Sequence, residues 1–287
     1  MHKEPRIVML TSNNVRHRAA AQRLARKTNM VGIVSEGKIP LVAGSELLSE
    51  ADQLVRKQHF SERDAVERQF FGADVAFPDT RLHEIQQGTI NAPSVLDWIQ
   101  QQNPDLIVLY GTGLVKPPLL SFYDNRIINI HLGLSPYYRG AGTNFWPLVY
   151  REPEYVGATI HLAVERVDAG GILVQVRPPA EINDRAHELG TKTIIHGFEA
   201  MPQVLSLYLE GRLVPHRQDL SEGRVFKRKD FNAESVRTMW RHFDTGMMEE
   251  YLAQAEERWR RCPIVENVVA GLTSGPTEQA ASQVARQ

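Results

Sequence analysis

The chain has 287 residues, of which 42% are hydrophobic, so a sizeable core can form in one large domain with a small appendage. Its 33 basic and 34 acidic residues nearly cancel, and the net charge of -1 argues against a general nucleic-acid-binding protein. The single cysteine, Cys262, excludes an intramolecular disulfide and a cysteine-rich metal site, and with no signal peptide or membrane-spanning apolar run we expect a cytoplasmic protein.

The first elements predict a β-α-β unit. Residues 6–11 form an apolar run typical of a buried strand, and residues 12–14 form a turn. Residues 16–27 are rich in helix-forming alanine and leucine, and residues 30–34 resemble a second buried strand. This order predicts an α/β protein whose central, mostly parallel sheet is flanked by helices.

The middle of the chain continues the alternation. Residues 47–71 are charged and helix-prone, and we expect them to form an insertion that packs on the sheet edge. A helix with Ser94 as its N-cap precedes Pro104, and residues 106–110 predict a central strand. The loop at residues 111–113 contains two glycines but lacks the spacing of a nucleotide-phosphate motif.

The most informative stretch is residues 126–140. Strand alternation places Asn129 and His131 on the same face, and Pro136 and Gly140 then break the strand into a loop. A polar pair where a buried strand enters a loop is a common location for catalytic residues in α/β proteins.

A second signal lies further along the chain. Residues 158–164 and 172–176 predict two strands, and the loop between them places Asp168 beside a pair of glycines that permit close backbone approach. Residues 143–150 predict a helix that Thr143 or Asn144 caps.

The C-terminal part predicts an extension. A helix at residues 191–209 ends the main domain, and residues 212–231 favour a β-hairpin with Gly223 at its turn. Residues 232–261 resemble two helices. The predicted units are residues 1–210 for the catalytic domain, 211–270 for a hairpin-plus-helix extension and 271–287 for a disordered tail.

The polar residues of the two loops suit one kind of chemistry. Asn129 offers an amide N–H to a developing oxyanion, and His131 can move a proton near neutral pH. Asp168 can orient the imidazole or order a water molecule. None of the three is a nucleophile of the serine or cysteine kind, so the set favours direct attack by a substrate amine on an acyl donor.

The Asn-x-His strand end, the Leu-x-Pro loop and the Asp-x-Gly-Gly loop together resemble the folate-dependent formyltransferases. These include the glycinamide ribonucleotide, methionyl-tRNA and sugar N-formyltransferases. The resemblance implies a Rossmann-like sheet, 10-formyltetrahydrofolate as the formyl donor and no metal. It also implies that Asn129, His131 and Asp168 are catalytic. It further implies that main-chain groups in two loops hold the pteridine ring of the formyl donor. These groups belong to Leu114, Lys116, Arg166 and Val167.

The acceptor side looks most like the sugar N-formyltransferases, because of Tyr137, Tyr138, Arg139 and Trp146. Aromatic faces suit a sugar or a base, and Arg139 suits a phosphate or carboxylate. The first loop lacks the Gly-Ser-Asn phosphate loop expected for glycinamide ribonucleotide, and the C-terminal part is short for a tRNA-binding barrel. We therefore expect a small-molecule acceptor, a primary amine on a nucleotide-linked amino sugar. The three aromatic residues could instead belong to the core or a homodimer interface, and Arg139 to a surface ion pair.

Other functions stay open at this point. The acceptor could be methionyl-tRNA or an amino-acid-derived amine, and the chain could be a 10-formyltetrahydrofolate hydrolase. A metal-dependent hydrolase would use His131, His161 and Asp168 as ligands, although alternation does not require His161 to face His131. A folate-binding protein without catalysis is a further alternative. The C-terminal extension could complete the acceptor site or form a homodimer contact.

Overall fold

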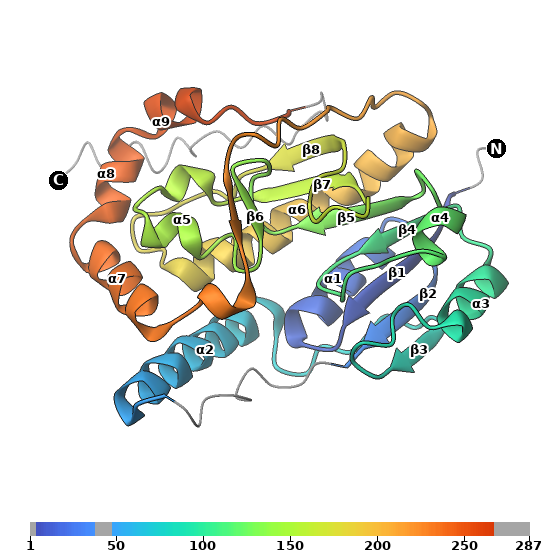
Figure 1. Cartoon of the computed structure of the whole chain (residues 1–287), viewed down its shortest axis with the longest axis horizontal. Helices are drawn as coiled ribbons and strands as arrows, with labels where there is room; N and C mark the ends of the chain where they lie inside the picture. The colour runs from blue at the N-terminus through green and yellow to red at the C-terminus, as the bar shows by residue number, and fades with distance from the viewer. Residues whose placement is uncertain (1–3, 38–47, 267–287) are drawn as a thin grey trace.

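A seven-stranded sheet forms the centre of the computed structural model, which describes residues 4–37 and 48–266 (Figure 1). The strand order is β3-β2-β1-β4-β5-β7-β8. The strands from β3 to β5 pair in parallel, whereas β7 pairs antiparallel with both β5 and β8, so the predicted α/β fold is confirmed. The strands are β1 (Arg6–Ser12), β2 (Asn29–Glu36), β3 (Leu82–Ile85), β4 (Leu106–Leu109), β5 (Ile127–His131), β7 (Ala158–Leu162) and β8 (Ile172–Val176).

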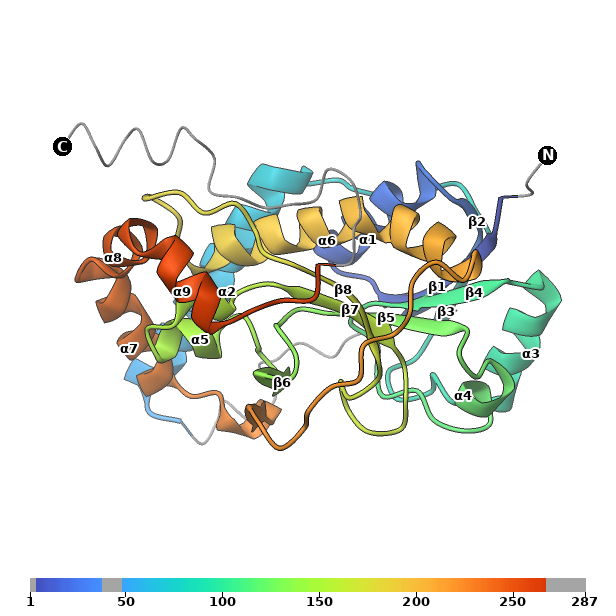
Figure 2. The same ribbon diagram turned by 90° about the horizontal axis from the view of Figure 1, so that it is seen from above.

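Helices cover both faces of the sheet, as Figure 2 shows. Helices α1 (Val15–Ala25) and α6 (Ala186–Leu209) lie on one face, and α3 (Pro93–Gln102) and α4 (Leu119–Phe122) lie on the other. Ile128 and Ile130 of β5 pack into the core beneath α1 and α6, and Ile127 packs into the core beneath α3. Because side chains alternate along a strand, Asn129 and His131 lie on the same side as Ile127.

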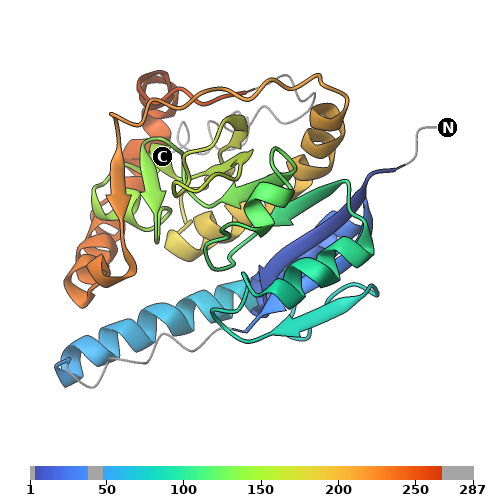
Figure 3. The ribbon, with the colours of Figure 1, turned by 45° about the vertical axis from the view of Figure 1, so that its right-hand side comes forward.

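A small second sheet replaces the predicted hairpin. Strand β9 (Arg224–Phe226) pairs in parallel with β6 (Tyr138–Gly140), so the prediction of a hairpin within residues 212–231 was wrong (Figure 3). The pairing depends on long-range packing, because the Phe226 ring stacks on Trp146 with centroids 4.5 Å apart. Gly140 has φ +94°, and a Cβ there would lie 2.2 Å from the Phe226 carbonyl oxygen, so this contact requires glycine.

Three predicted helix details need correction. Helix α3 begins at Pro93 after Ala92 without a side-chain cap, so Ser94 is not its cap; proline needs no partner for a missing N–H at this position. Helix α5 (Trp146–Val149) is shorter than predicted. Asn144 does not cap it, because its side-chain oxygen accepts a hydrogen bond from Gly157 N at 3.0 Å.

Helix α2 (Glu50–Phe71) packs against helices rather than on the sheet edge. Its neighbours are α1, α6 and α7, which corrects the predicted placement. The C-terminal part contains three helices where two were predicted: α7 (Ala233–Asp244), α8 (Met247–Ala253) and α9 (Ala255–Arg261). They share a third core with α5 and the start of α6. The predicted tail at residues 271–287 lies outside the described residues.

Within residues 4–37 and 48–266, none of the helices combines the length and apolar composition needed to cross a bilayer.

Candidate active site

Asn129, His131 and Asp168 converge where β5 ends. His131 Nδ1 lies 3.3 Å from Asp168 Oδ2, and Asn129 Nδ2 lies 3.5 Å from Asp168 Oδ1. The side chains of His131 and Asp168 expose only 7% and 11% of their surface. Asn129 and His131 therefore contact the same carboxylate, which lies 39 and 37 positions further along the chain.

The backbone around Asp168 is held in an unusual conformation. Asp168 has φ +48°, which lies in the left-handed region that costs a non-glycine residue roughly 1–2 kcal/mol. Gly140 N donates to Asp168 Oδ2 at 3.0 Å. A Cβ on Gly170 would lie 1.8 Å from the Leu162 carbonyl oxygen, so this glycine allows the loop to fold back onto β7. Together these contacts direct the carboxylate toward His131.

His161 also belongs to this cluster, and sequence reasoning considered it only as a metal ligand. Its Nε2 lies 3.0 Å from Asn129 Nδ2 and 3.7 Å from Asp168 Oδ1, while its Nδ1 lies 2.8 Å from Leu162 O. Because only an N–H can bond the Leu162 carbonyl, Nδ1 carries the proton and Nε2 accepts from Asn129. Asn129 and His161 are direct partners across the antiparallel β5–β7 pair. Strand alternation alone could not reveal this, because the register of β7 is not visible in the sequence.

Burial and neighbouring charges set the ionisation of the site. Burial raises the pKa of Asp168, but His131, His161 and the Gly140 N–H outweigh it and hold that pKa well below its usual range. Burial lowers the pKa of His131, and the Asp168 charge opposes this only in part. At neutral pH the site therefore holds an ionised carboxylate beside a neutral imidazole. The second ring nitrogen of His131 lies 3.1 Å from the Tyr138 carbonyl oxygen.

The predicted donor-binding residues lie in two partly exposed loops. Leu114 and Val167 expose 46% and 44% of their surface, and Lys116 and Arg166 are also exposed. Four of the predicted main-chain groups have partners. Asn91 accepts from Lys116 N at 2.7 Å and donates to Leu114 O at 2.8 Å, and the carbonyl oxygens of Lys116 and Arg166 accept from Leu120 N and Ala169 N. The Lys116 N–H is therefore engaged by the protein itself.

The predicted acceptor residues have different surroundings. Tyr138 and Trp146 are buried, and both rings stack on Phe226, which agrees with the alternative of a packing role. The Tyr137 hydroxyl donates to Pro263 O at 3.1 Å, and its ring packs edge-on against Tyr155.

Arg139 is a buried cation. It exposes 5% of its surface, and its Nε has no hydrogen-bond partner within residues 4–37 and 48–266. Among the residues of the described ranges, no carboxylate forms an ion pair with it. Burial lowers the pKa of Arg139, and the nearby Arg166 charge acts in the same direction.

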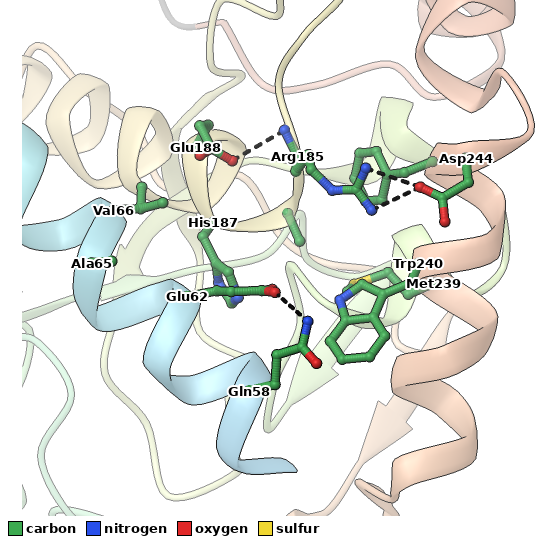
Figure 4. Close-up of a pocket in the computed structure, with 12 residues that line it drawn as sticks. Gln58, Glu62, Ala65, Val66, Arg185, His187, Glu188, Met239, Trp240 and Asp244 are labelled. Atoms are coloured by element: carbon green, nitrogen blue, oxygen red, sulfur yellow. Dashed lines mark hydrogen bonds and ion pairs between the residues drawn. The ribbon is translucent and has the colours of Figure 1, made fainter. Parts of the chain in front are cut away.

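A cavity of about 410 Å³ lies elsewhere, between α2, α7 and the start of α6 (Figure 4). Two pairs of its polar side chains bond each other: Gln58 Nε2 donates to Glu62 at 2.9 Å, and Arg185 donates to Asp244 at 3.0 Å. None of its lining residues belongs to the Asn129, His131 and Asp168 cluster, so we place the candidate site at the end of β5.

The metal-site alternative has little geometric support. In the part of the chain that the structure describes, no group of three or more His, Cys, Asp or Glu side chains could hold a metal ion.

Comparisons with known proteins show which proteins this chain resembles. Residues 6–205 match the family model described as Formyl transferase. The methionyl-tRNA formyltransferase of Caldanaerobacter subterraneus is 32% identical over 156 residues, which are 51% of this chain and 50% of that protein. The chain thus matches about half the length of this curated relative.

Solved structures show the same fold. The glycinamide ribonucleotide transformylase 1 of Symbiobacterium toebii has a TM-score of 0.52 at 21% identity, over 76% of this chain and 96% of that one. A sugar N-formyltransferase from a Shewanella species has a TM-score of 0.50 at 18% identity, over 79% and 78% of the two chains. The family model spans most of the chain and both loops that form the Asn129, His131 and Asp168 cluster. The chain therefore belongs to the formyl transferase family.

Proposed function

We propose that the chain transfers a formyl group from 10-formyltetrahydrofolate to a primary amine, with residues 1–210 as the catalytic unit. The observation that carries this proposal is the contact of Asp168 with both His131 and Asn129 at the end of β5. An ionised carboxylate, a neutral imidazole and an amide donor are what amine attack on a formyl carbon requires.

Each residue has a defined part in this reaction. The acceptor nitrogen attacks the formyl carbon and becomes positively charged, and His131 takes its proton. Asp168, held ionised, stabilises the resulting imidazolium. Asn129 donates to the formyl oxygen as negative charge develops there, a contact worth ~2.7–4 kcal/mol in other enzymes. When the tetrahedral intermediate collapses, the bond between the formyl carbon and N10 of the folate breaks, and the His131 imidazolium returns its proton to N10 as tetrahydrofolate leaves. In the free protein the Asn129 N–H groups face His161 and Asp168, so one of them must turn to the substrate.

The donor loops suit a folate. Leu114 and Val167 are exposed apolar side chains, and the surface of a pteridine ring would cover such groups. Because the Lys116 N–H is bonded to Asn91, we assign the polar contacts with the ring to the N–H groups of Leu114, Arg166 and Val167 and to the four carbonyl oxygens, each of which can accept two hydrogen bonds.

The acceptor that fits best is a nucleotide-linked amino sugar. Among the described residues, no carboxylate pairs with the buried guanidinium of Arg139, and a phosphate of the acceptor would supply a negative charge for it. Tyr137, two positions before Arg139, is half-buried, and we assign its ring to the sugar or base. Tyr138 and Trp146 would support these residues through their packing on Phe226 rather than touch the acceptor.

An acceptor screen tests this function. The purified chain is incubated with 10-formyltetrahydrofolate and a nucleotide-linked amino sugar, methionyl-tRNA or a hydroxyornithine-type amine, and formylated product is detected by mass spectrometry. We expect product with the amino sugar and a raised KM for it in Arg139→Met. Methionyl-tRNA is the second candidate, because that curated relative is 32% identical over the matched part. Product with only the tRNA would replace the proposed acceptor, and no product from any class would contradict the function.

A further inference from the structure

Gln218 holds the loop that carries Asp168. Its side-chain Nε2 donates to the Asp168 carbonyl oxygen at 3.0 Å and to the Gly170 carbonyl oxygen at 2.6 Å. Gln218 exposes 8% of its surface and lies 50 positions from Asp168 in the chain. A single amide therefore ties two carbonyl groups of the loop to the C-terminal segment.

Backbone hydrogen bonds hold the segment that carries Gln218 against β8. His216 and Ile172 exchange two backbone hydrogen bonds, of 2.8 and 2.7 Å, across the edge of β8. Ile172 follows the Asp168 loop directly, so the same short segment anchors the loop at its end and, through Gln218, in its middle. This geometry gives the amide little freedom to move away.

The orientation of the amide follows from its neighbours. Turning Gln218 by 180° about its terminal bond would place Oε1 against two carbonyl oxygens, which repel it. In the observed orientation Oε1 is buried and has no hydrogen-bond partner among the residues that the structure describes. Leaving a buried oxygen without a hydrogen bond raises the free energy of the folded state. The two hydrogen bonds that Nε2 donates must offset this cost, so we infer that they determine how the side chain is placed.

We propose that Gln218 is a positioning residue that keeps the Asp168 carboxylate directed at His131. Asp168 has a left-handed backbone, φ +48°, and such a conformation persists only when surrounding contacts enforce it. Gln218 supplies two of those contacts from outside the family-matched residues 6–205. The expected effect on catalysis rests on the proposed function. The position of the Asp168 carboxylate can be measured without catalysis.

The test replaces Gln218 by methionine, which keeps the length of the side chain and removes the donor. Gln203→Met is the matched control, because Gln203 is exposed on α6. We expect Gln218→Met to lower kcat by about 10²-fold while KM for the acceptor stays within a factor of about two, because a small displacement of a catalytic group can cost this much. Gln203→Met should leave both constants unchanged.

Hydrogen exchange gives a readout that does not depend on turnover. The Gly140 N–H is bonded to Asp168 Oδ2, so it should exchange faster in Gln218→Met if the carboxylate moves away. If Gln218→Met does not fold, Gln218→Asn, which keeps the amide on a shorter stem, takes its place in both assays. Unchanged kcat with unchanged Gly140 exchange in a folded variant would overturn the proposal. If the wild-type chain transfers no formyl group, the proposed function fails, and the exchange experiment alone still decides the role of Gln218.

Discussion

At the scale of single residues, local pattern predicted part of the site. Asn129 and His131 follow from alternation along one strand, and Asp168 follows from its position before two glycines. His161 was missed as a partner of Asn129, because this contact depends on the β5–β7 register. The packing of Trp146 could not be predicted either, because it stacks on Phe226, which is 80 positions away.

The ionisation of His131 predicts how transfer depends on pH. Burial lowers the pKa of His131 below its ordinary value of about 6.5, so the neutral base predominates at pH 7. We expect kcat/KM to rise with pH along a limb whose midpoint lies below pH ~6.5. The measurement is a pH profile of kcat/KM with saturating donor. An ascending limb centred above pH ~7 would show that another group, or a charged His131, controls the rate.

Removing the Asp168 charge gives the matched comparison. The carboxylate raises the pKa of His131 and so opposes the effect of burial. In Asp168→Asn the ascending limb of the pH profile of the remaining kcat/KM should therefore move to lower pH. A limb that moves to higher pH would show that the two side chains do not interact in this way.

At the scale of elements, the parallel β-α-β units were predictable, whereas the contacts that complete the site were not. Buried apolar strands and alternating helices gave β1, β2, β4 and β5 close to their observed bounds. Strand β9 was predicted as half of a local hairpin, but it pairs with β6. The apolar pattern of β9 fits both a local hairpin and pairing with β6. Only its contacts with aromatic residues far away in the chain distinguish the two arrangements.

Two glycines test how tightly the Asp168 loop is constrained. A Cβ on Gly170 would lie 1.8 Å from a backbone oxygen of β7, so Gly170→Ala must displace the loop. We expect it to lower the free energy of unfolding by ~1–3 kcal/mol and to reduce transfer. Gly190→Ala in α6 meets nothing within 4 Å and should stabilise the protein by ~0.5–1 kcal/mol with unchanged transfer. Denaturant unfolding and kcat of both variants check this, and equal effects at the two sites would contradict it.

At the scale of the whole molecule, the C-terminal extension and the main sheet form one structure. Helices α7 and α8 share a core with Leu148 and Leu189, β9 completes the small sheet, and Gln218 reaches the Asp168 loop. The sequence indicated that the extension has apolar positions but not what they cover. That information lies in contacts between residues far apart in the chain.

The buried His59 and the half-buried His187 predict how stability depends on pH. His59 and His187 have ring centroids 4.6 Å apart, and burial lowers their pKa values to about 3 and about 4. Between those values and about 6.5 the unfolded chain binds protons that the folded chain does not, so stability falls as pH falls through this window. We expect Tm to drop by at least a few degrees between pH ~7 and ~4.5.

Substitution of the pair identifies its share of this effect. His59→Phe should make the dependence of Tm on pH shallower, because one buried titrating ring is removed. His216→Gln is the control, because the His216 side chain is exposed and only its backbone bonds β8. Parallel Tm curves for the wild type and His59→Phe would show that His59 does not contribute.

The most direct measurement of the central claim is the rate of tetrahydrofolate release from 10-formyltetrahydrofolate, with and without the acceptor amine, in the wild type and in His131→Ala. We predict release that requires the acceptor, slowed by about 10²–10⁴-fold in the folded variant. Equal rates in the two proteins, or release that does not depend on the acceptor, would contradict formyl transfer by Asn129, His131 and Asp168.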